Sequence, residues 1–290
     1  MNYVIITPVK NENKTFLYTL ESVLNQKKRP SEWLIIDDNS TDGTYETVER
    51  FIQSYSWIRL IKILKNPYHD YSARVVYLFN KGLEHIKEDY DIVIKLDADV
   101  TFDCDFFEKI IGEFQNNHKL GIASGHLVVD GEKEILLFNN NSTRGATKAY
   151  RKQCLLEIGG LYPYQSWDTL DGAAARAKGW ITKTFPYAFN HLKREGSKAG
   201  SNIKNRFRTG LSNGRIPYRL DYFLIKAFSK ASEKPAFLST LAQIVGYIES
   251  RYILKIHPFP DYVARQVQKE QAEILKSLVR FKDVRNLWNH

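Results

Sequence analysis

The sequence predicts an α/β fold with a mostly parallel central sheet flanked by helices, followed by a helical C-terminal appendage. Short apolar segments alternate with segments of helical periodicity over residues 1–100, which is the pattern of βαβ units. Acidic side chains follow three of the strand-like segments. The last hundred residues are basic, and their apolar residues recur at helical spacing.

The first half of the chain supplies four predicted strands and three predicted helices. Each strand is a short apolar run, and each helix places apolar residues on one side, as Phe16, Leu20 and Val23 do. The loops that follow the strands should line one edge of the sheet, because parallel strands end at the same edge. The predicted strands are residues 3–7, 33–36, 58–64 and 91–96, and the predicted helices are residues 14–25, 44–54 and 72–86.

The second half is less regular. It contains a predicted helix over residues 105–116 and predicted strands over residues 121–129, 134–138 and 182–189. From residue 218 the pattern is helical, and it ends in an amphipathic helix predicted over residues 261–287. We therefore expect an α/β domain over residues 1–190, with halves 1–100 and 101–190, and a basic, mainly helical region over residues 191–290.

The composition indicates an ordered globular protein that stays in the cytoplasm. The first residues lack the features of a signal peptide, and no run of about 18 uncharged apolar residues occurs. Cys104 and Cys154 fit a reducing compartment, where both are most simply small buried hydrophobes.

Charge is distributed unevenly along the chain. Residues 1–190 carry 23 Lys and Arg against 25 Asp and Glu, whereas residues 191–290 carry 19 against 8, so the net charge of +9 arises in the last third. Such a region attracts polyanions, namely nucleic acid, an anionic membrane surface or a phosphorylated substrate. No nucleic-acid-binding motif is recognisable, and we expect no nucleic acid partner.

Two carboxylates follow the fourth predicted strand at Asp97 and Asp99. Alternate residues of a strand share a face, so both carboxylates should project from the carboxyl end of the sheet, where α/β proteins bind ligands. Two carboxylates this close repel each other unless a cation lies between them, and oxygen ligands suit Mg²⁺ or Mn²⁺. The alternative is that Asp-x-Asp here is only a turn or a helix cap.

Acidic residues also follow the first two predicted strands, at Glu12 and at Asp37 and Asp38. A carboxylate at this edge can accept a hydrogen bond from a nucleobase N–H or a ribose hydroxyl. Neither the G-x-G-x-x-G motif nor the P-loop motif occurs in the chain, which disfavours a Rossmann dehydrogenase and a P-loop NTPase.

Three stretches together resemble the nucleotide-sugar half of the family 2 glycosyltransferases of GT-A fold. They are Thr7-Pro8-Val-Lys-Asn-Glu12, Leu34-Ile-Ile-Asp-Asp-Asn-Ser-Thr-Asp-Gly-Thr44 and Lys95-Leu-Asp-Ala-Asp-Val100. The resemblance covers about the first 100 residues closely. The Asp-Asp-Asn-Ser-Thr-Asp-Gly-Thr stretch is its most specific part, because Asp-x-Asp alone is common.

The resemblance assigns donor-binding roles in the first half. Asp38 would accept from the base, Asp37 belongs to the same motif, and the ribose would contact Asp97. Arg74 falls where the family often has a basic residue near the base or phosphates, but the family's spacing after it is not kept, and a helix-surface arginine is the alternative. The remaining residues implied to line the donor pocket are Thr7, Pro8 and Glu12.

The resemblance also assigns metal ligands. Asp99 would bind Mn²⁺ or Mg²⁺ that bridges the two phosphates of the donor. In related enzymes a histidine beyond the acceptor half can be another ligand, and His191 follows the strand predicted over residues 182–189. A surface or hydrogen-bonded histidine is the alternative for this position.

The resemblance further implies a general base on the acceptor side. Asp168 stands eleven residues before Gly179, where the family has its acidic residue. Trp167 replaces the usual preceding glutamate, and an apolar neighbour could raise the pKa of the acid and make it a better base. The alternative is that Asp168 caps the following helix, with Asp171 in its first turn; for Asp171 we expect a supporting or capping role.

These features predict an inverting, metal-dependent glycosyltransferase of hexosyltransferase type, acting in cell-surface polysaccharide or glycolipid assembly. Its partners would be a nucleotide-sugar donor and a saccharide or lipid-linked saccharide acceptor. The amphipathic, basic segments 220–228 and 237–254 could hold it peripherally on the inner face of an anionic membrane, or could pack on the catalytic domain. The alternatives are a sugar-phosphate nucleotidyltransferase and a non-catalytic membrane- or polyanion-binding protein.

Overall fold

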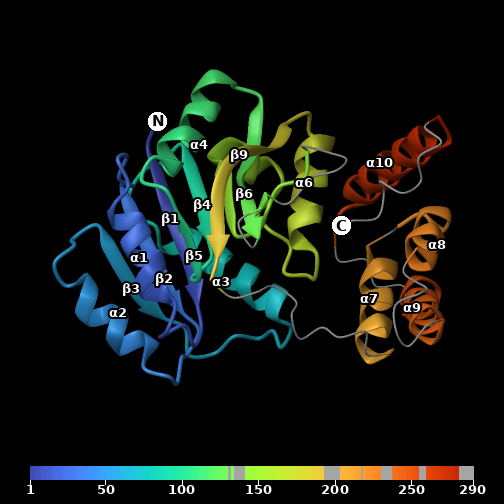
Figure 1. Cartoon of the computed structure of the whole chain (residues 1–290), viewed down its shortest axis with the longest axis horizontal. Helices are drawn as coiled ribbons and strands as arrows, with labels where there is room; N and C mark the ends of the chain where they lie inside the picture. The colour runs from blue at the N-terminus through green and yellow to red at the C-terminus, as the bar shows by residue number, and fades with distance from the viewer. Residues whose placement is uncertain are drawn as a thin grey trace. The chain divides into compact units, whose positions relative to one another are not determined.

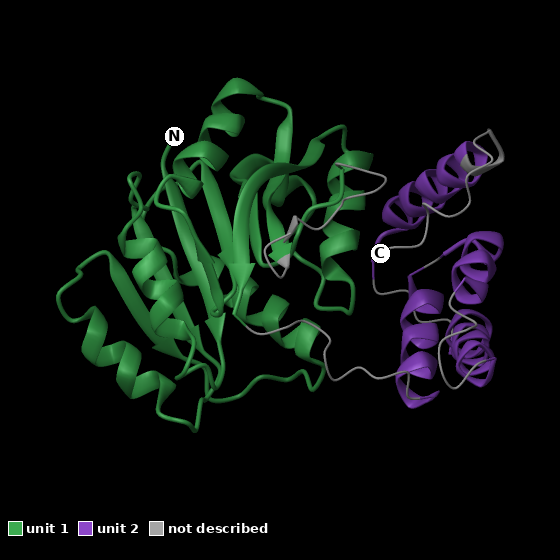
Figure 2. Ribbon diagram, in the orientation of Figure 1, with its two compact units in different colours: residues 1–194 green, residues 195–290 purple. Residues whose placement is uncertain are grey.

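The computed structural model describes residues 1–129, 132–133, 141–192, 203–216, 218–229, 237–254 and 259–280. The chain divides into two compact units, Met1–Arg194 and Glu195–His290 (Figure 2). The strand predicted over residues 134–138 and the end of the last predicted helix lie outside the described residues.

Unit 1 is a mixed α/β structure, and it confirms the predicted fold class (Figure 1). The predicted strands and helices of the first half are all present, with ends shifted by a few residues at most. The described elements are β1 (Tyr3–Val9), α1 (Phe16–Leu24), β2 (Glu32–Asp37), α2 (Thr44–Ile52), β3 (Ile58–Lys62), α3 (Tyr71–His85), β4 (Ile92–Leu96), β5 (Val100–Phe102), α4 (Phe106–Asn116), β6 (Leu120–Val129), β7 (Glu132–Lys133), β8 (Thr147–Arg151), α5 (Lys152–Glu157), α6 (Trp167–Ala177) and β9 (Ile181–His191).

One sheet runs through unit 1 in the order β3-β2-β1-β4-β8-β6-β9-β5, with β7 paired to β6. The strands β3, β2, β1 and β4 are parallel, as predicted for βαβ units. The second half is mixed, because β8 runs antiparallel to both β4 and β6, and β5 runs antiparallel to β9. The expectation of a mostly parallel sheet therefore applies to the first half.

The central strands are buried on both faces. Every residue of β1 and β2 is buried, since α1 and α4 contribute to the core on one face and α3 packs on the other. On the first face, the core includes Tyr3, Trp33 and Phe107. On the second, Gly82 of α3 lies so close to the sheet that an added Cβ would come within 2.6 Å of Ile6.

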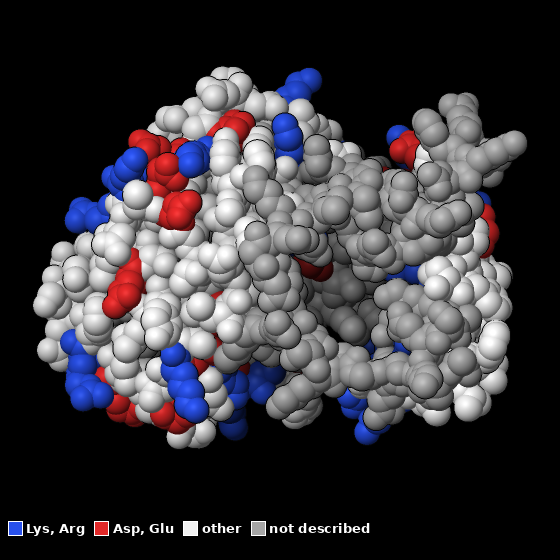
Figure 3. All heavy atoms as spheres, viewed as in Figure 1, with Lys and Arg blue, Asp and Glu red and all other residues white. Residues whose placement is uncertain are grey.

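The described part of unit 2 is helical. It consists of α7 (Ile203–Arg215), α8 (Leu220–Phe228), α9 (Leu238–Ile248), a π-helical segment η1 (Glu249–Leu254) and α10 (Asp261–Arg280). Within the described ranges, no helix has both the length and the apolar character needed to cross a membrane. On the face of unit 1 seen in Figure 3, acidic and basic side chains are interspersed, in keeping with its balanced charge.

Candidate active site

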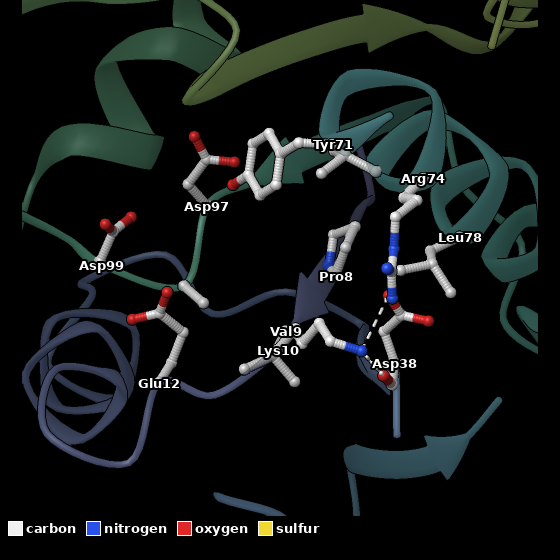
Figure 4. Close-up of a pocket in the computed structure, with 12 residues that line it drawn as sticks. Pro8, Val9, Lys10, Glu12, Asp38, Tyr71, Arg74, Leu78, Asp97 and Asp99 are labelled. Atoms are coloured by element: carbon white, nitrogen blue, oxygen red, sulfur yellow. Dashed lines mark hydrogen bonds and ion pairs between the residues drawn. The ribbon is translucent and has the colours of Figure 1, made fainter. Parts of the chain in front are cut away.

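A pocket opens at the carboxyl ends of β1, β2 and β4, against the first turn of α3. Figure 4 shows its two ends: Asp97, Asp99 and Glu12 lie on one side, and Asp38, Lys10 and Arg74 on the other. Pro8 and Tyr71 lie between them. The pocket is lined by Pro8, Val9, Lys10, Glu12, Asp38, Tyr71, Arg74, Val75, Leu78, Asp97, Ala98 and Asp99.

Asp38 is buried at one end of the pocket, where two cations hold it in place. Arg74 donates to Asp38 Oδ2 through Nε at 2.9 Å and also through its terminal nitrogen. Lys10 Nζ donates to the Asp38 backbone carbonyl at 2.7 Å and lies 3.7 Å from Oδ2. The Asp38 backbone N–H donates to the Val9 carbonyl at 2.9 Å. The aspartate is therefore fixed as an acceptor between positive charges.

Thr7 and Asp37 differ from the expectation that they contribute side chains to this pocket. Both are fully buried and neither lines it. The Thr7 hydroxyl accepts from Trp33 Nε1 at 2.9 Å, inside the core. Asp37 Oδ1 accepts from the Ser40 N–H at 2.9 Å and so shapes the loop that carries Asp38. Asp37 thus supports the loop that carries Asp38, whereas Thr7 supports the core beneath the pocket.

Glu12 lines the pocket, and its loop is tied to the next βα loop. The Glu12 N–H donates to Thr44 Oγ1 at 2.9 Å, while Thr15 Oγ1 donates to Glu12 Oε2 at 2.5 Å. Asn13 and Asp42 also link the two loops, through an Asn13 N–H bond of 3.1 Å to Asp42 Oδ2. The polar stretch after β2 thus holds the loop after β1 in position.

Asp97, Asp99 and His191 form a cluster at the other end of the pocket. One ligand atom from each residue lies within 4.8 Å of the others. His191 Nδ1 is 3.5 Å from Asp99 Oδ2, and His191 Nε2 is 3.9 Å from Asp97 Oδ2. Strand pairing explains this proximity, because β5 follows Asp99 directly and its Val100 is in register with His191 of β9. In addition, the Leu192 N–H donates to the Asp99 carbonyl at 2.8 Å.

The cluster has a lysine beneath it that the sequence reasoning did not identify. Lys95 Nζ is buried and donates to Asp97 Oδ1 and to the Gly145 carbonyl, the latter at 3.1 Å. Burial raises the pKa of the Asp97 carboxyl, but the charge of Lys95 and the hydrogen bond from His191 outweigh it and lower that pKa below its ordinary value. Asp97 is therefore held as a carboxylate. Lys95 lies two positions before Asp97 and therefore on the same face of the strand, which is the signal that could have revealed it.

The donor set of the cluster fits a divalent cation. Two carboxylates and one imidazole suit Mn²⁺, and the carboxylates alone suit Mg²⁺. The side chains of Asp97, Asp99 and His191 are each partly exposed, at 21%, 12% and 13%, and Asp97 and Asp99 line the pocket. Whether all three residues or only Asp99 and His191 bind the cation, coordination positions would remain for oxygens of a bound molecule.

Asp168 lies in the first turn of α6. The N-cap of this helix is Ser166, with φ of 63°, so the alternative that Asp168 caps the helix is wrong. The Asp168 side chain is partly exposed, and its Cβ lies 3.8 Å from the position of a Cβ built on Gly145. The carbonyl of Gly145 also accepts from Lys95. Gly145 therefore lies between the start of α6 and the lysine that supports the cluster.

A buried polar network anchors the start of α6. Lys148 Nζ donates to the Asp168 carbonyl at 2.6 Å and to Asp171 Oδ1 at 2.7 Å, and Tyr150 donates to Asp171 Oδ2 at 2.5 Å. Burial raises the pKa of the Asp171 carboxyl, while Lys148 and Tyr150 oppose that rise. Asp171 is thus a structural residue, as its supporting role anticipated. Lys148 and Tyr150 were not identified from the sequence, because no strand was predicted over residues 147–151, where the structure has β8.

Six basic residues follow His191 between residues 193 and 208, and none of those that the structure describes lines the pocket. Lys193, Arg194 and Lys198 lie outside the described residues. The other three belong to α7 in unit 2 and are described there; they are Lys204, Arg206 and Arg208.

The amino-acid sequence matches a family model described as "Glycosyl transferase family 2" over residues 4–152. Two curated relatives are the poly-beta-1,6-N-acetyl-D-glucosamine synthase of Staphylococcus epidermidis, 30% identical over 126 residues, and the minor teichoic acid biosynthesis protein GgaA of Bacillus subtilis, 31% identical over 135 residues. The matches cover 43% and 46% of this chain but 28% and 29% of those proteins. The chain thus matches less than a third of the length of these relatives.

Solved structures resemble the chain over nearly its whole length. Staphylococcus aureus TarS 1-349 in complex with UDP-GlcNAc has a TM-score of 0.59 and 18% identity, with 99% of this chain and 89% of that chain covered. The mannosyltransferase PcManGT from Pyrobaculum calidifontis, in complex with GDP-Man and Mn²⁺, has a TM-score of 0.58 and 16% identity, with 96% and 79% covered. The likeness confirms the predicted GT-A fold.

Proposed function

Because this chain belongs to glycosyl transferase family 2, we propose that it transfers a sugar from a nucleoside-diphosphate sugar to a hydroxyl group of a saccharide acceptor. The observation that carries this proposal is the two-ended pocket at the carboxyl edge of the sheet. One end presents Asp38 between two cations, and the other presents Asp97 and Asp99, which form a cluster with His191.

The two ends of the pocket suit the two ends of a nucleotide. Asp38 would accept from a nucleobase N–H, since Arg74 and Lys10 both interact with its Oδ2 and leave Oδ1 available among the described residues. Pro8 and Tyr71 between the two ends would contact the nucleoside. Asp97 would then accept from the ribose, with Lys95 holding its carboxylate in position.

Asp99 and His191 would hold Mn²⁺ or Mg²⁺ at the diphosphate end. When bound, such a cation supplies positive charge that stabilises the departing nucleoside diphosphate. The Mn²⁺ and GDP-Man in the PcManGT complex are consistent with this assignment. Glu12 lies on the same side of the pocket and could hydrogen-bond the ribose or a cation-bound water.

Asp168 would act as the general base. It takes the proton of the acceptor hydroxyl while that oxygen bonds to the anomeric carbon and the bond to the diphosphate oxygen breaks. One displacement with one base inverts the configuration at the anomeric centre. The partial exposure of Asp168 at the start of α6, beside the Lys95-linked end of the pocket, supports this role.

The relatives suggest where the reaction belongs. They are named for a poly-N-acetylglucosamine synthase and for teichoic acid biosynthesis, and both products are cell-surface polymers. We therefore propose that this chain extends a cell-surface polysaccharide or teichoic acid, and that UDP-GlcNAc, present in the TarS complex, is the first donor to test.

The donor site can be tested by thermal unfolding. UDP, GDP, dTDP and CDP are added singly, each with and without Mn²⁺, to the wild type and to Asp99→Asn. One nucleotide should raise the Tm in the presence of Mn²⁺, because a ligand at 100 times its Kd stabilises the folded state by about 2.7 kcal/mol. Asp99→Asn should abolish the increase that depends on Mn²⁺.

Asp89→Asn is the matched control, since the Asp89 side chain is 91% exposed and lies outside the pocket. It should respond to the nucleotide as the wild type does. If no nucleotide stabilises the wild type at millimolar concentration, the proposed donor site is wrong. If stabilisation is equal with and without Mn²⁺, the metal assignment is wrong and the pocket assignment stands.

A further inference from the structure

The helix α9 packs with its polar face inward. Ser239, Thr240 and Gln243 are almost fully buried, at 1%, 4% and 3% exposure. Tyr247 is buried on the same side, at 1% exposure, whereas five other large apolar side chains lie on the opposite face, at 45–58% exposure. We call these five the apolar stripe: Leu238, Leu241, Val245, Ile248 and Tyr252, the last of which belongs to η1. Exposed apolar area of this kind costs free energy in water. A stripe of this size therefore indicates a surface that binds a partner.

Small residues bring α7 and α9 unusually close together. A Cβ added at Gly210 would lie 2.0 Å from the Gln243 carbonyl oxygen, and one at Gly246 would lie 2.3 Å from the Phe207 carbonyl oxygen. Gly210 and Gly214 have the G-x-x-x-G spacing. Contacts between small residues, with apolar side chains outside, are typical of helix pairs in apolar surroundings. The close contact with α7 therefore requires small and polar residues on the inner face of α9 and leaves the apolar stripe on its outer face.

The stripe borders a groove between α7 and α9. The residues that line the groove are Ile203, Lys204, Phe207, Leu238, Leu241, Ala242 and Val245. The helix α9 has 11 residues and no charge, whereas a membrane-spanning helix needs about 20. An apolar surface this short is suited to lie on a bilayer, with its side chains at the boundary between headgroups and acyl chains.

Charge distinguishes a lipid surface from a second copy of this chain. The helix α7 contains Lys204, Arg206, Arg208 and Arg215 and no acidic residue. Residues 191–290 as a whole have 19 basic against 8 acidic residues. A two-fold pairing of this surface with itself would bring the cations of two α7 helices together, whereas anionic headgroups attract them.

We propose that α7, α9 and η1 dock unit 2 on an anionic lipid bilayer, with the apolar stripe inserted and the α7 cations at the headgroups. The inference does not depend on the transfer reaction, because it uses no residue of the pocket in unit 1.

The test is co-sedimentation of the full chain with vesicles of phosphatidylcholine alone or with about one third phosphatidylglycerol. The wild type should bind the anionic vesicles, with binding weakened by high salt, and should bind the neutral vesicles much less. Replacing Leu241, Val245 and Ile248 together by serine should reduce binding by roughly tenfold or more, because each side chain loses apolar area that inserts.

The matched control is the double variant Leu64→Ser with Leu156→Ser. These side chains are 73% and 67% exposed in unit 1, so the control removes exposed apolar area elsewhere and should bind like the wild type. Circular dichroism melting confirms that each variant is folded.

Equal sedimentation of the stripe variant and the wild type would overturn the proposal. So would equal binding to neutral and anionic vesicles. A wild type that is dimeric without lipid, becomes monomeric in the stripe variant and fails to bind vesicles would instead identify the surface as an interface between copies.

Discussion

The position of Asp168 is fixed through its backbone and through the residues around it. Its backbone carbonyl accepts from the buried Lys148, and Lys148 is held by Asp171. The Trp167 ring is buried, with Lys95 Nζ at 5.2 Å and Lys148 Nζ at 5.3 Å from its centroid. Trp167 therefore contacts both Lys95, which supports the Asp97 cluster, and Lys148, which anchors the start of α6. The family resemblance implies a carboxylate at this position.

At this scale we predict that Asp168→Asn lowers kcat by a factor of about 10² to 10⁴, the range contributed by a general base. The donor KM should change little, because Asp168 does not line the donor pocket. Steady-state kinetics with a sugar donor that carries the nucleotide identified by thermal unfolding measures both. Asp89→Asn should leave kcat unchanged, and an Asp168→Asn variant with wild-type kcat would exclude this residue as the base.

The elements of unit 1 converge on the pocket through close packing. The carboxyl ends of β1, β2 and β4 present acidic residues, and α3 presents Arg74 and Tyr71 from its first turn. The position of α3 depends on Gly82, where an added Cβ would lie 2.6 Å from Ile6 Cγ2 and 2.7 Å from Ile36 Cδ1. Only glycine allows this helix to lie so close to β1 and β2.

We therefore predict that Gly82→Ala lowers the free energy of unfolding by about 1 to 3 kcal/mol, the usual cost of overpacking a core. Because α3 must shift, nucleotide affinity should fall as well. Gly112→Ala is the control, since Gly112 lies within α4 and an added Cβ meets nothing within 4 Å. It should stabilise the protein by about 0.5 to 1 kcal/mol. Urea unfolding measures both, and a neutral Gly82→Ala would contradict the close-packing argument.

At the scale of the whole molecule, all residues that line the proposed donor pocket belong to unit 1. His191, the last residue of β9, belongs to it as well. Unit 2 has its own small core around Phe223 and Tyr247, whose rings stack with centroids 4.0 Å apart. Each unit thus has internal packing of its own.

We predict that a nucleotide with Mn²⁺ slows amide hydrogen exchange in the loops after β1, β2 and β4 and in the first turn of α3. Exchange in α8 and α10 should be unchanged, because no described residue of these helices lines the pocket. Mass spectrometry of peptic fragments reports both regions in one sample. Protection of α8 and α10 equal to that of the loops would show that nucleotide binding involves unit 2.

Local sequence patterns are enough to predict the elements of the first half and the acidic loops at the edge of the sheet. Strand and helix periods are local properties, and the βαβ pattern places Glu12, Asp38, Asp97 and Asp99 at one edge whatever the details of packing. The acidic motifs in these loops also predicted the family, and the family model that matches residues 4–152 confirmed that prediction.

Contacts between residues distant in sequence could not be predicted, because they depend on how the strands and helices pack in three dimensions. The pairing of β5 with β9 brings His191 to Asp99, the buried Lys95 supports Asp97, and Thr7 and Asp37 face the core and the loop backbone instead of the pocket. The inward polar face of α9 also depends on its fit to α7, since an apolar stripe alone predicts a buried face. Periodicity indicates that a face is apolar, but the partner that covers it is chosen by packing.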